Sequence, residues 1–183
     1  MAEADGYSID GALITHYHPD HVGGDLFGLP IEGVARLLEL RDVPLYVNRH
    51  EAAGLRQVTG VSASDLRLVD SDDRIEFGAH ELRFLHTPGH TPGSQCFLID
   101  GRLIAGDTLF VGGCGRVDLP GGDADALYHS LTQRLARLPA GTVLYPGHHY
   151  GSEPTSTIGR EQTENIYLNV PSLEAWHRLL GHP

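Results

Sequence analysis

The stretch Ala12–Gly24, "ALITHYHPDHVGG", places three histidines and an aspartate within six positions, directly after a short apolar run. Imidazole and carboxylate groups crowded this tightly are costly as surface decoration, and they are ligand types that zinc, iron and manganese accept. The apolar run "GALIT" predicts a buried strand that delivers the cluster at its carboxyl end. The stretch therefore predicts a metal site built from His16, His18, Asp20 and His21.

Similar residues recur at later turns, each after a strand-like run. They lie in "HTPGHTPGS" (His90), "AGDTLF" (Asp107) and "YPGHHYG" (His148), and "GGCGR" follows the second of these. Loops that leave one edge of a sheet converge in space although they are distant in sequence. Pro and Gly beside the ligands suit sharply bent backbones that aim an imidazole inward.

The ligand count fits two divalent metal ions. Three imidazole nitrogens form one set of ligands for a single metal ion. A second set combines imidazole and carboxylate groups, and Asp107 remains to bridge the two metal ions. Nitrogen and oxygen ligands without thiolate suit zinc foremost, with iron or manganese as alternatives, and leave positions open for water or substrate. The first set is His16, His18 and His90, and the second is Asp20, His21 and His148.

Strand-like and helix-like segments alternate along the chain, which predicts a layered α/β domain. The clearest amphipathic helix is residues 123–139, with Leu127, Leu131, Leu135 and Leu138 on one face and Pro139 at its end. Further helices are predicted at 31–40, 49–58 and 172–181. Strands are predicted at 11–15, 44–48, 66–69, 74–78, 81–87, 94–100, 102–110 and 141–149.

The composition is that of an ordinary globular protein, and we expect a single domain over residues 1–183. The formal charge is −11 and all 13 basic residues are arginine, which excludes Schiff-base chemistry on lysine and disfavours nucleic acid as a partner. Neither Cys96 nor Cys114 lies in a CxxC motif, so reduced thiols are expected. No apolar run predicts a membrane span and the start lacks a signal-peptide pattern, so we expect a cytoplasmic protein without a membrane partner.

Five motifs resemble one family. "THYHPDHVGG" matches the THxHxDH signature of the metallo-β-lactamase superfamily, and "TPGHTPGS", "GDTLF", "GGCGR" and "YPGHHYG" follow in that family's order. The resemblance spans residues 11–165 and implies a four-layer αββα sandwich with a dinuclear site. It assigns His16, His18, His90 and Asp107 to one metal, and Asp20, His21, His148 and Asp107 to the other, and it does not make Cys114 a ligand.

Such a site implies a metal-dependent hydrolase with a bridging hydroxide that attacks a polarised carbonyl. Asp107 would bridge the metals, and Asp20 would bind the second metal and orient the hydroxide. A thioester suits a site without a general acid, because a thiol has a pKa of about 8.5 and leaves as thiolate. "GGCGR" resembles the glyoxalase II branch, which implies a hydroxyacyl-glutathione-like substrate. The chain departs from that branch by reading "RVDLPGGD" after Gly115.

A second branch is the alternative. "GRVDLPGG", "ALYHSL" and "STIGRE" resemble persulfide dioxygenases, which hold one iron by two histidines and an aspartate. That triad would be His16, His90 and Asp107. Under either activity, Arg116 would contact an anionic group of a small-molecule substrate, or else tie down its own loop. A non-catalytic metal-binding protein is the third alternative.

The beginning of the chain is short for this family, which usually has several strands before the first histidine motif. The resemblance therefore predicts that the sandwich lacks N-terminal strands, exposes apolar surface and forms a homodimer. "MAEADGYSID" predicts a last helical turn ended by Gly6. His149 lies beside a ligand or faces solvent. The remaining histidines are expected at the surface or satisfied in the core: His50, His80, His86, His129, His177 and His182.

Overall fold

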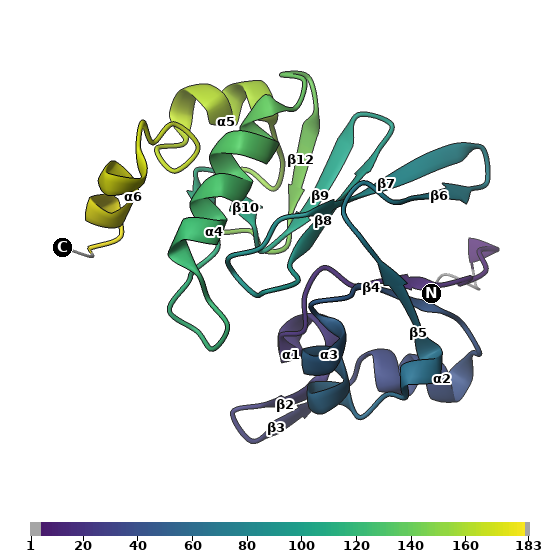
Figure 1. Ribbon diagram of the computed structural model, residues 1–183. Coiled ribbons are helices and arrows are strands. Elements are labelled where there is room, and N and C mark those ends of the chain that lie inside the picture. The colour runs from purple at the N-terminus through teal and green to yellow at the C-terminus, as the bar shows by residue number, and fades with distance from the viewer. Residues whose placement is uncertain (1–4, 182–183) are drawn as a thin grey trace. The chain divides into compact units, whose positions relative to one another are not determined.

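Two compact units, Met1–Val69 and Asp70–Pro183, make up the chain in the computed structural model, which describes residues 5–181 (Figure 1). We refer to them as unit 1 and unit 2. Each has its own sheet, helices and hydrophobic core. The α/β class expected from the alternating pattern is confirmed, and the single domain over residues 1–183 stays a prediction.

Unit 1 is built on a three-stranded parallel sheet in the order β1-β4-β5. The strands are β1 (Ala12–Leu13), β4 (Leu45–Asn48) and β5 (Leu66–Val69), and the helices are α1 (Pro19–Val22), α2 (Val34–Leu40), α3 (Ala52–Thr59) and a 3₁₀ turn (Ala63–Asp65). An antiparallel hairpin joins β2 (Gly24–Leu26) to β3 (Leu29–Ile31). The core is aliphatic and includes Ile14, Val22, Val47 and Leu55.

Two features of unit 1 differ from the predictions. The helix predicted over 31–40 begins only at Val34, because Ile31 lies in β3 and Gly33 is in an extended conformation. A Cβ on Gly33 would lie 2.0 Å from the carbonyl oxygen of Val22, so the chain passes too close for any other residue. The unpredicted β2–β3 hairpin turns at Phe27 and Gly28, both with positive φ (56° and 85°), as a two-residue type I′ turn requires.

Unit 2 is built on a six-stranded sheet in the order β13-β12-β9-β8-β7-β6, in which only β12 and β9 pair in parallel. A separate short hairpin joins β10 to β11 immediately after β9. The bounds are β6 (Arg74–Phe77), β7 (His80–His86), β8 (Gln95–Ile99), β9 (Arg102–Gly106), β10 (Leu109–Phe110), β11 (Gly113–Cys114), β12 (Val143–Pro146) and β13 (Ser156–Thr157).

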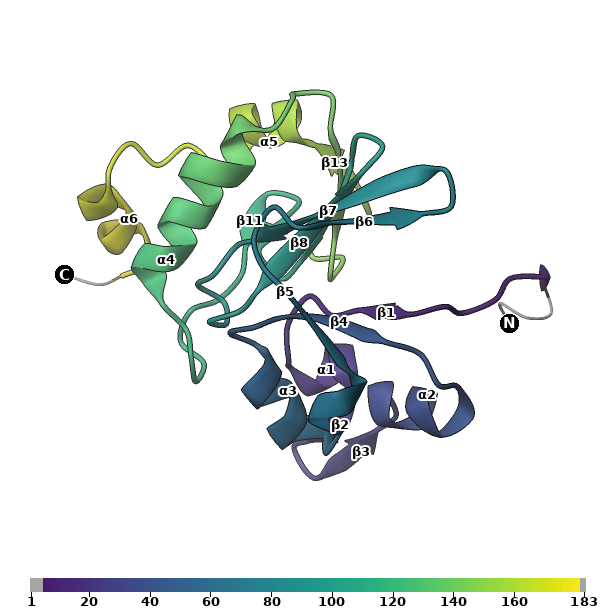
Figure 2. The ribbon, with the colours of Figure 1, turned by 45° about the vertical axis from the view of Figure 1, so that its right-hand side comes forward.

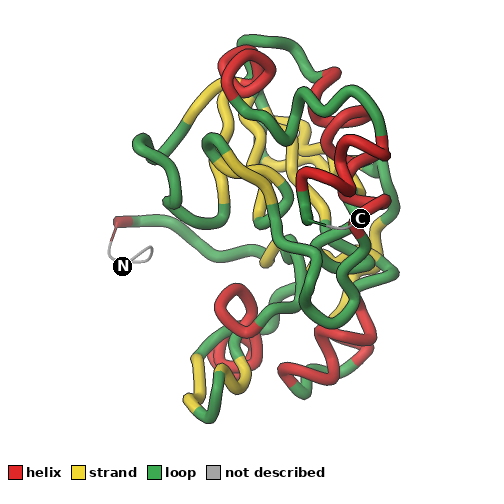
Figure 3. Tube along the Cα trace, turned by 90° about the vertical axis from the view of Figure 1, so that its left-hand side faces the viewer, coloured by secondary structure: helices red, strands yellow, loops and turns green. Residues whose placement is uncertain are grey.

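Helices cover one face of this sheet (Figures 1 and 2). They are α4 (Ala124–His129) and α5 (Ile158–Glu164), while α6 (Leu173–Leu179) packs on the side of α4 away from the strands. Helix α4 continues into a π-helical turn (Ser130–Arg134) and a 3₁₀ turn (Leu135–Arg137). Figure 3 shows these helical turns beside the strands. The four leucines predicted on one face of residues 123–139 are buried against the sheet, which confirms the amphipathic pattern.

Other predictions have mixed outcomes. Both cysteines are free thiols, as expected. Helix α5 was not predicted, since its sequence lacks a marked apolar stripe. Gly6 has a φ of +81°, which suits a helix-ending glycine, whereas residues 1–4 of the predicted helical turn lie outside the described residues. Among residues 5–181, no helix is both long and apolar enough to cross a membrane.

Candidate metal centre

The first half-site is the group His16, His18, Asp20 and His21 in unit 1. These residues follow β1 and run into α1, where Pro19 occupies the first helical position, which its fixed φ and missing N–H suit. The short helix turns the chain back, so the ring centroids of His16 and His21 lie 4.2 Å apart and those of His16 and His18 lie 4.8 Å apart. His16 is only 1% exposed. These predicted ligands are therefore close in space as well as in sequence.

A buried glutamate holds this loop. Glu51, 0% exposed, accepts a hydrogen bond from the backbone N–H of Tyr17 at 2.7 Å. The Tyr17 ring packs on Gly54 of α3, where a Cβ would lie 2.5 Å from the ring. Burial, with the Glu51 charge adding to it, raises the pKa of Tyr17. The ligand loop is thereby fixed to α3 between His16 and His18.

The second half-site is the group His90, Asp107 and His148 in unit 2. The three residues follow β7, β9 and β12, which lie in one sheet. The Oδ2 atom of Asp107 is 3.8 Å from His90 Nε2 and 3.3 Å from His148 Nε2. A single carboxylate oxygen thus lies within reach of both imidazoles, in a position from which it can bridge.

Two glycines allow the backbone to approach Asp107 closely. A Cβ on Gly147, next to His148, would lie 2.3 Å from Asp107 Oδ1. A Cβ on Gly115 would lie 2.0 Å from the carbonyl oxygen of Asp107 and 3.2 Å from His90 Cβ. The glycines of "YPGHHYG" and "GGCGR" are therefore required by the close packing of the ligands.

The orientation of His90 is fixed by a backbone group. Its Nδ1–H donates to the carbonyl oxygen of Arg116 at 2.8 Å, because a carbonyl can only accept. The proton therefore sits on Nδ1 and the lone pair of Nε2 faces Asp107. This is the arrangement by which proteins orient a metal-ligating histidine.

The Arg116 side chain forms a bidentate ion pair with Asp118, with both N–O distances at 2.6 Å. Hydrogen bonding to Arg116 lowers the pKa of Asp118 to about 2, and that of Arg116 is raised. This ion pair with Asp118 supports the alternative in which Arg116 holds its own loop in place. Its contact with a substrate stays a prediction.

Among residues 5–181, the other histidines are not grouped with these predicted ligands. His149 is exposed, and His80 and His177 pair with the surface carboxylates of Asp100 and Asp125. His182 lies outside the described residues.

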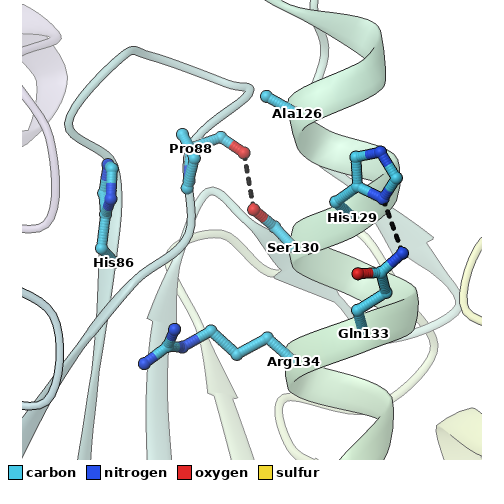
Figure 4. Close-up of a pocket in the computed structure, with 7 residues that line it drawn as sticks. All are labelled: His86, Pro88, Ala126, His129, Ser130, Gln133 and Arg134. Atoms are coloured by element: carbon cyan, nitrogen blue, oxygen red, sulfur yellow. Dashed lines mark hydrogen bonds between the residues drawn. The ribbon is translucent and has the colours of Figure 1, made fainter.

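Unit 2 has a groove of about 510 Å³, and Figure 4 shows the residues that line it. Its polar groups bind one another or neighbouring residues: Ser130 donates to the Pro88 carbonyl, Gln133 binds His129, and Arg134 binds Asp72. None of the seven predicted metal ligands lines this groove.

The donors present fit a divalent metal ion. Each half-site offers imidazole nitrogen and carboxylate oxygen, and in each the donors lie a few ångströms apart. The sequence reasoning missed Glu51, which only the fold brings to the backbone N–H of Tyr17.

Known proteins of two different activities resemble this chain. The human mitochondrial persulfide dioxygenase ETHE1 is 34% identical over 173 residues, which cover 93% of this chain and 61% of that protein. The hydroxyacylglutathione hydrolase of Tolumonas auensis is 37% identical over 162 residues, covering 87% of this chain and 56% of that protein. The chain therefore spans less than two thirds of either relative.

A solved structure, TTHA1623 in a di-iron-bound form, matches with a TM-score of 0.71 and 34% identity, covering 91% of this chain and 81% of that one. The profile of the Metallo-beta-lactamase superfamily matches residues 2–148, a range that holds all seven predicted ligands. The chain belongs to the metallo-beta-lactamase superfamily.

Proposed function

We propose that the two half-sites serve one dinuclear metal centre and that the protein is a hydrolase of thioesters. The observation that carries the proposal is the position of Asp107 Oδ2, 3.8 Å from His90 Nε2 and 3.3 Å from His148 Nε2. The family resemblance assigns those two histidines to different metals, so their shared carboxylate has the position of a bridge. The di-iron form of TTHA1623 supports the count of two.

The chain's own residues would divide the work as follows. His16, His18 and His90 would hold one ion, and Asp20, His21 and His148 the other, with Asp107 between them. A bound pair of divalent ions supplies hydroxide at neutral pH and polarises a carbonyl. Asp20, exposed at the start of α1, would orient the attacking group. The leaving thiolate needs no proton from the protein, and the chain has no lysine to supply one.

The rival is a mononuclear iron persulfide dioxygenase. Its support is the likeness to human ETHE1, which extends over 93% of this chain. That activity would need only His16, His90 and Asp107, and the remaining ligand-type residues would be accessory. The likeness to the hydroxyacylglutathione hydrolase of T. auensis is of similar strength, and the full set of ligand-type residues is compatible with both activities.

The test is the metal content of protein purified without added metal, paired with two assays on the same preparation. Two ions per chain, cleavage of a hydroxyacyl-glutathione thioester and no oxygen uptake on glutathione persulfide would support the hydrolase. One iron per chain with oxygen uptake would overturn it in favour of the dioxygenase. A chain that binds metal but shows neither activity would overturn both and support the non-catalytic metal-binding protein, whereas a chain that binds no metal would overturn all three.

A further inference from the structure

A buried polar network on α5 reaches the hairpin that follows Asp107. Glu161 is 1% exposed and Asn165, immediately after the helix, is 0% exposed. Oε2 of Glu161 accepts hydrogen bonds from the backbone N–H of Gly112 at 2.8 Å and from Nδ2 of Asn165 at 2.9 Å. Nδ2 of Asn165 also donates to the carbonyl oxygens of Gly113 (3.0 Å) and Phe110 (3.3 Å). The turn of the β10–β11 hairpin is therefore held by side chains.

The same hairpin touches every ligand of the second half-site. Asp107 precedes its first strand, and the hairpin's exit residue Gly115 donates its N–H to Thr108 beside Asp107 at 3.2 Å. The next residue supplies the carbonyl that orients His90. The Phe110 ring lies 6.2 Å from the ring of His148, edge to face. A displacement of the hairpin would thus be felt at all three ligands.

The network is built from groups that are costly to bury. A buried carboxylate that is not hydrogen-bonded is strongly destabilising, and here one oxygen has two donors. If Glu161 is shortened, the N–H of Gly112 and the amide of Asn165 lose their acceptor inside the protein. These buried hydrogen bonds link α5 to the turn of the hairpin, and this link indicates a role for the hairpin's position.

We propose that Glu161 and Asn165 are positioning residues for the second half-site, acting through the β10–β11 hairpin to set the orientation of His90 and Asp107. Neither touches a ligand directly. The inference rests on the proposed metal-binding function and deepens it, since it predicts how tightly the second half-site binds. Residues that support metal ligands from outside typically change metal affinity 10- to 100-fold when substituted.

The test compares four variants in the full chain. Glu161→Ala should weaken Zn²⁺ affinity by about 10- to 100-fold in a competition titration with a chelator. Glu161→Gln should retain most of the affinity, because the amide oxygen can accept both hydrogen bonds. Glu164→Gln, on the same helix but in an exposed pair with Arg160, is the matched control. Leu135→Ala lowers stability from the same core and should leave the affinity of the folded protein unchanged.

As a second readout, backbone amide hydrogen exchange and the ¹⁵N chemical shifts of the His90 ring are measured in metal-free protein. In Glu161→Ala we expect faster exchange at Gly112 and altered ¹⁵N shifts of the His90 ring, with neither change in Leu135→Ala. Zn²⁺ affinity equal in Glu161→Ala and wild type would overturn the inference. A wild-type chain that binds no Zn²⁺ would instead refute the proposed function. The measurements on metal-free protein would then test the positioning role by themselves, and unchanged ¹⁵N shifts of His90 in Glu161→Ala would overturn that role.

Discussion

The two half-sites reach similar ligand geometry by different routes. In unit 1, four ligands come from one run of six residues, gathered by a single helical turn that starts at Pro19. In unit 2, three ligands come from positions 90 to 148 and meet because β7, β9 and β12 belong to one sheet. The first half-site is therefore a local structure, and the second depends on strand order and on close backbone packing.

Both half-sites are nevertheless held by the same device. In each unit a glutamate that is almost fully buried accepts a backbone N–H: Glu51 from Tyr17, between His16 and His18, and Glu161 from Gly112, in the hairpin after Asp107. The two glutamates differ in how directly they contact the segment that carries the predicted ligands. Glu51 holds the ligand loop directly, whereas Glu161 acts through a hairpin and a backbone carbonyl. The second half-site should consequently be the more sensitive to distant substitutions.

The largest expected effect comes from Asp107, the residue proposed to be shared between two metal ions. We expect Asp107→Asn to reduce the bound metal below one ion per chain and turnover by more than about 100-fold, since even supporting residues cost 10- to 100-fold. Metal analysis and steady-state rates measure this. The matched control is Asp100→Asn, which removes an exposed carboxylate from the same unit.

Single-metal ligands sharpen this result. His18→Ala in unit 1 and His148→Ala in unit 2 should each lower the metal content to about one ion and abolish most turnover if the centre is dinuclear. Full turnover in both variants, with loss only in Asp107→Asn, would contradict the dinuclear hydrolase and fit the three-ligand iron site.

Glycine substitutions compare the stability of the two units. Gly33→Ala and Gly115→Ala each place a Cβ 2.0 Å from a backbone oxygen, in unit 1 and unit 2 respectively, so each should lower the free energy of unfolding by about 3 kcal/mol or more. Gly141→Ala is the control, because a Cβ there has no neighbour within 4 Å. Urea unfolding followed by fluorescence of Trp176, in unit 2, measures the effect.

The single-domain prediction is tested by the same curves. Gly33 lies in unit 1 and Trp176 in unit 2. If residues 1–183 unfold as one cooperative unit, Gly33→Ala shifts the unfolding transition that the fluorescence of Trp176 reports. A transition that moves with Gly115→Ala but stays in place with Gly33→Ala would show two units that unfold separately.

Both cysteines lie in unit 2, and their thiols should make the free energy of unfolding depend on pH in the alkaline range. Burial raises the pKa of Cys96 to about 11 and that of Cys114 to about 12, from 9.0. The folded state therefore keeps protons that the unfolded state loses, so this stability is complete below pH 9 and falls as pH rises towards 11. We expect a loss of about 1 kcal/mol per thiol between pH 8 and pH 10.

Urea midpoints at the two pH values measure this loss, and a variant with both cysteines replaced by alanine should lose most of the slope. Thiol reagents should react slowly with the folded protein at pH 8 and quickly in urea, since thiolate is scarce in the folded state. Rapid labelling of the native protein would contradict the raised pKa values of the buried Cys96 and the half-buried Cys114.

The smallest expected effect lies in unit 1, far from the ligands of unit 2 in sequence. Phe27 is 97% exposed and has a φ of +56°, a left-handed conformation that asparagine tolerates better. Phe27→Asn should stabilise the protein by about 0.5 kcal/mol. Phe77→Asn, which removes an exposed phenylalanine from a strand, should bring no gain. A lower urea midpoint for Phe27→Asn would mean that the ring makes a stabilising contact.

Much of the candidate site could be predicted because metal-ligating residue types, and the Pro and Gly residues of the turns beside them, can be recognised in the sequence. His16, His18, Asp20 and His21 are adjacent in sequence, and a helical turn brings such spacings together without help from distant segments. The strands before His90, Asp107 and His148 were visible as apolar runs, and the structure confirms a strand before each. The family resemblance then ordered the ligands into two sets.

Other features could not be predicted, because they depend on atoms that are distant in sequence. Glu161 has the sequence appearance of a solvated helix residue, and only the packing of α5 on the hairpin makes it a buried acceptor. The orienting partner of His90 is a backbone carbonyl, which carries no residue identity at all. The helix predicted from Ile31 failed because Gly33 passes beside Val22, a contact that periodicity does not contain.

The sequence by itself determined the ligand types, their adjacency in unit 1, the α/β class and the amphipathic helix over 123–139, since each depends on residue type and short-range period. Only the tertiary structure decided that Asp107 Oδ2 lies within 4 Å of both His90 and His148, and that a buried glutamate holds each half-site. The physical reason is that strand register and close backbone approach are set by packing between segments, which a linear pattern does not record.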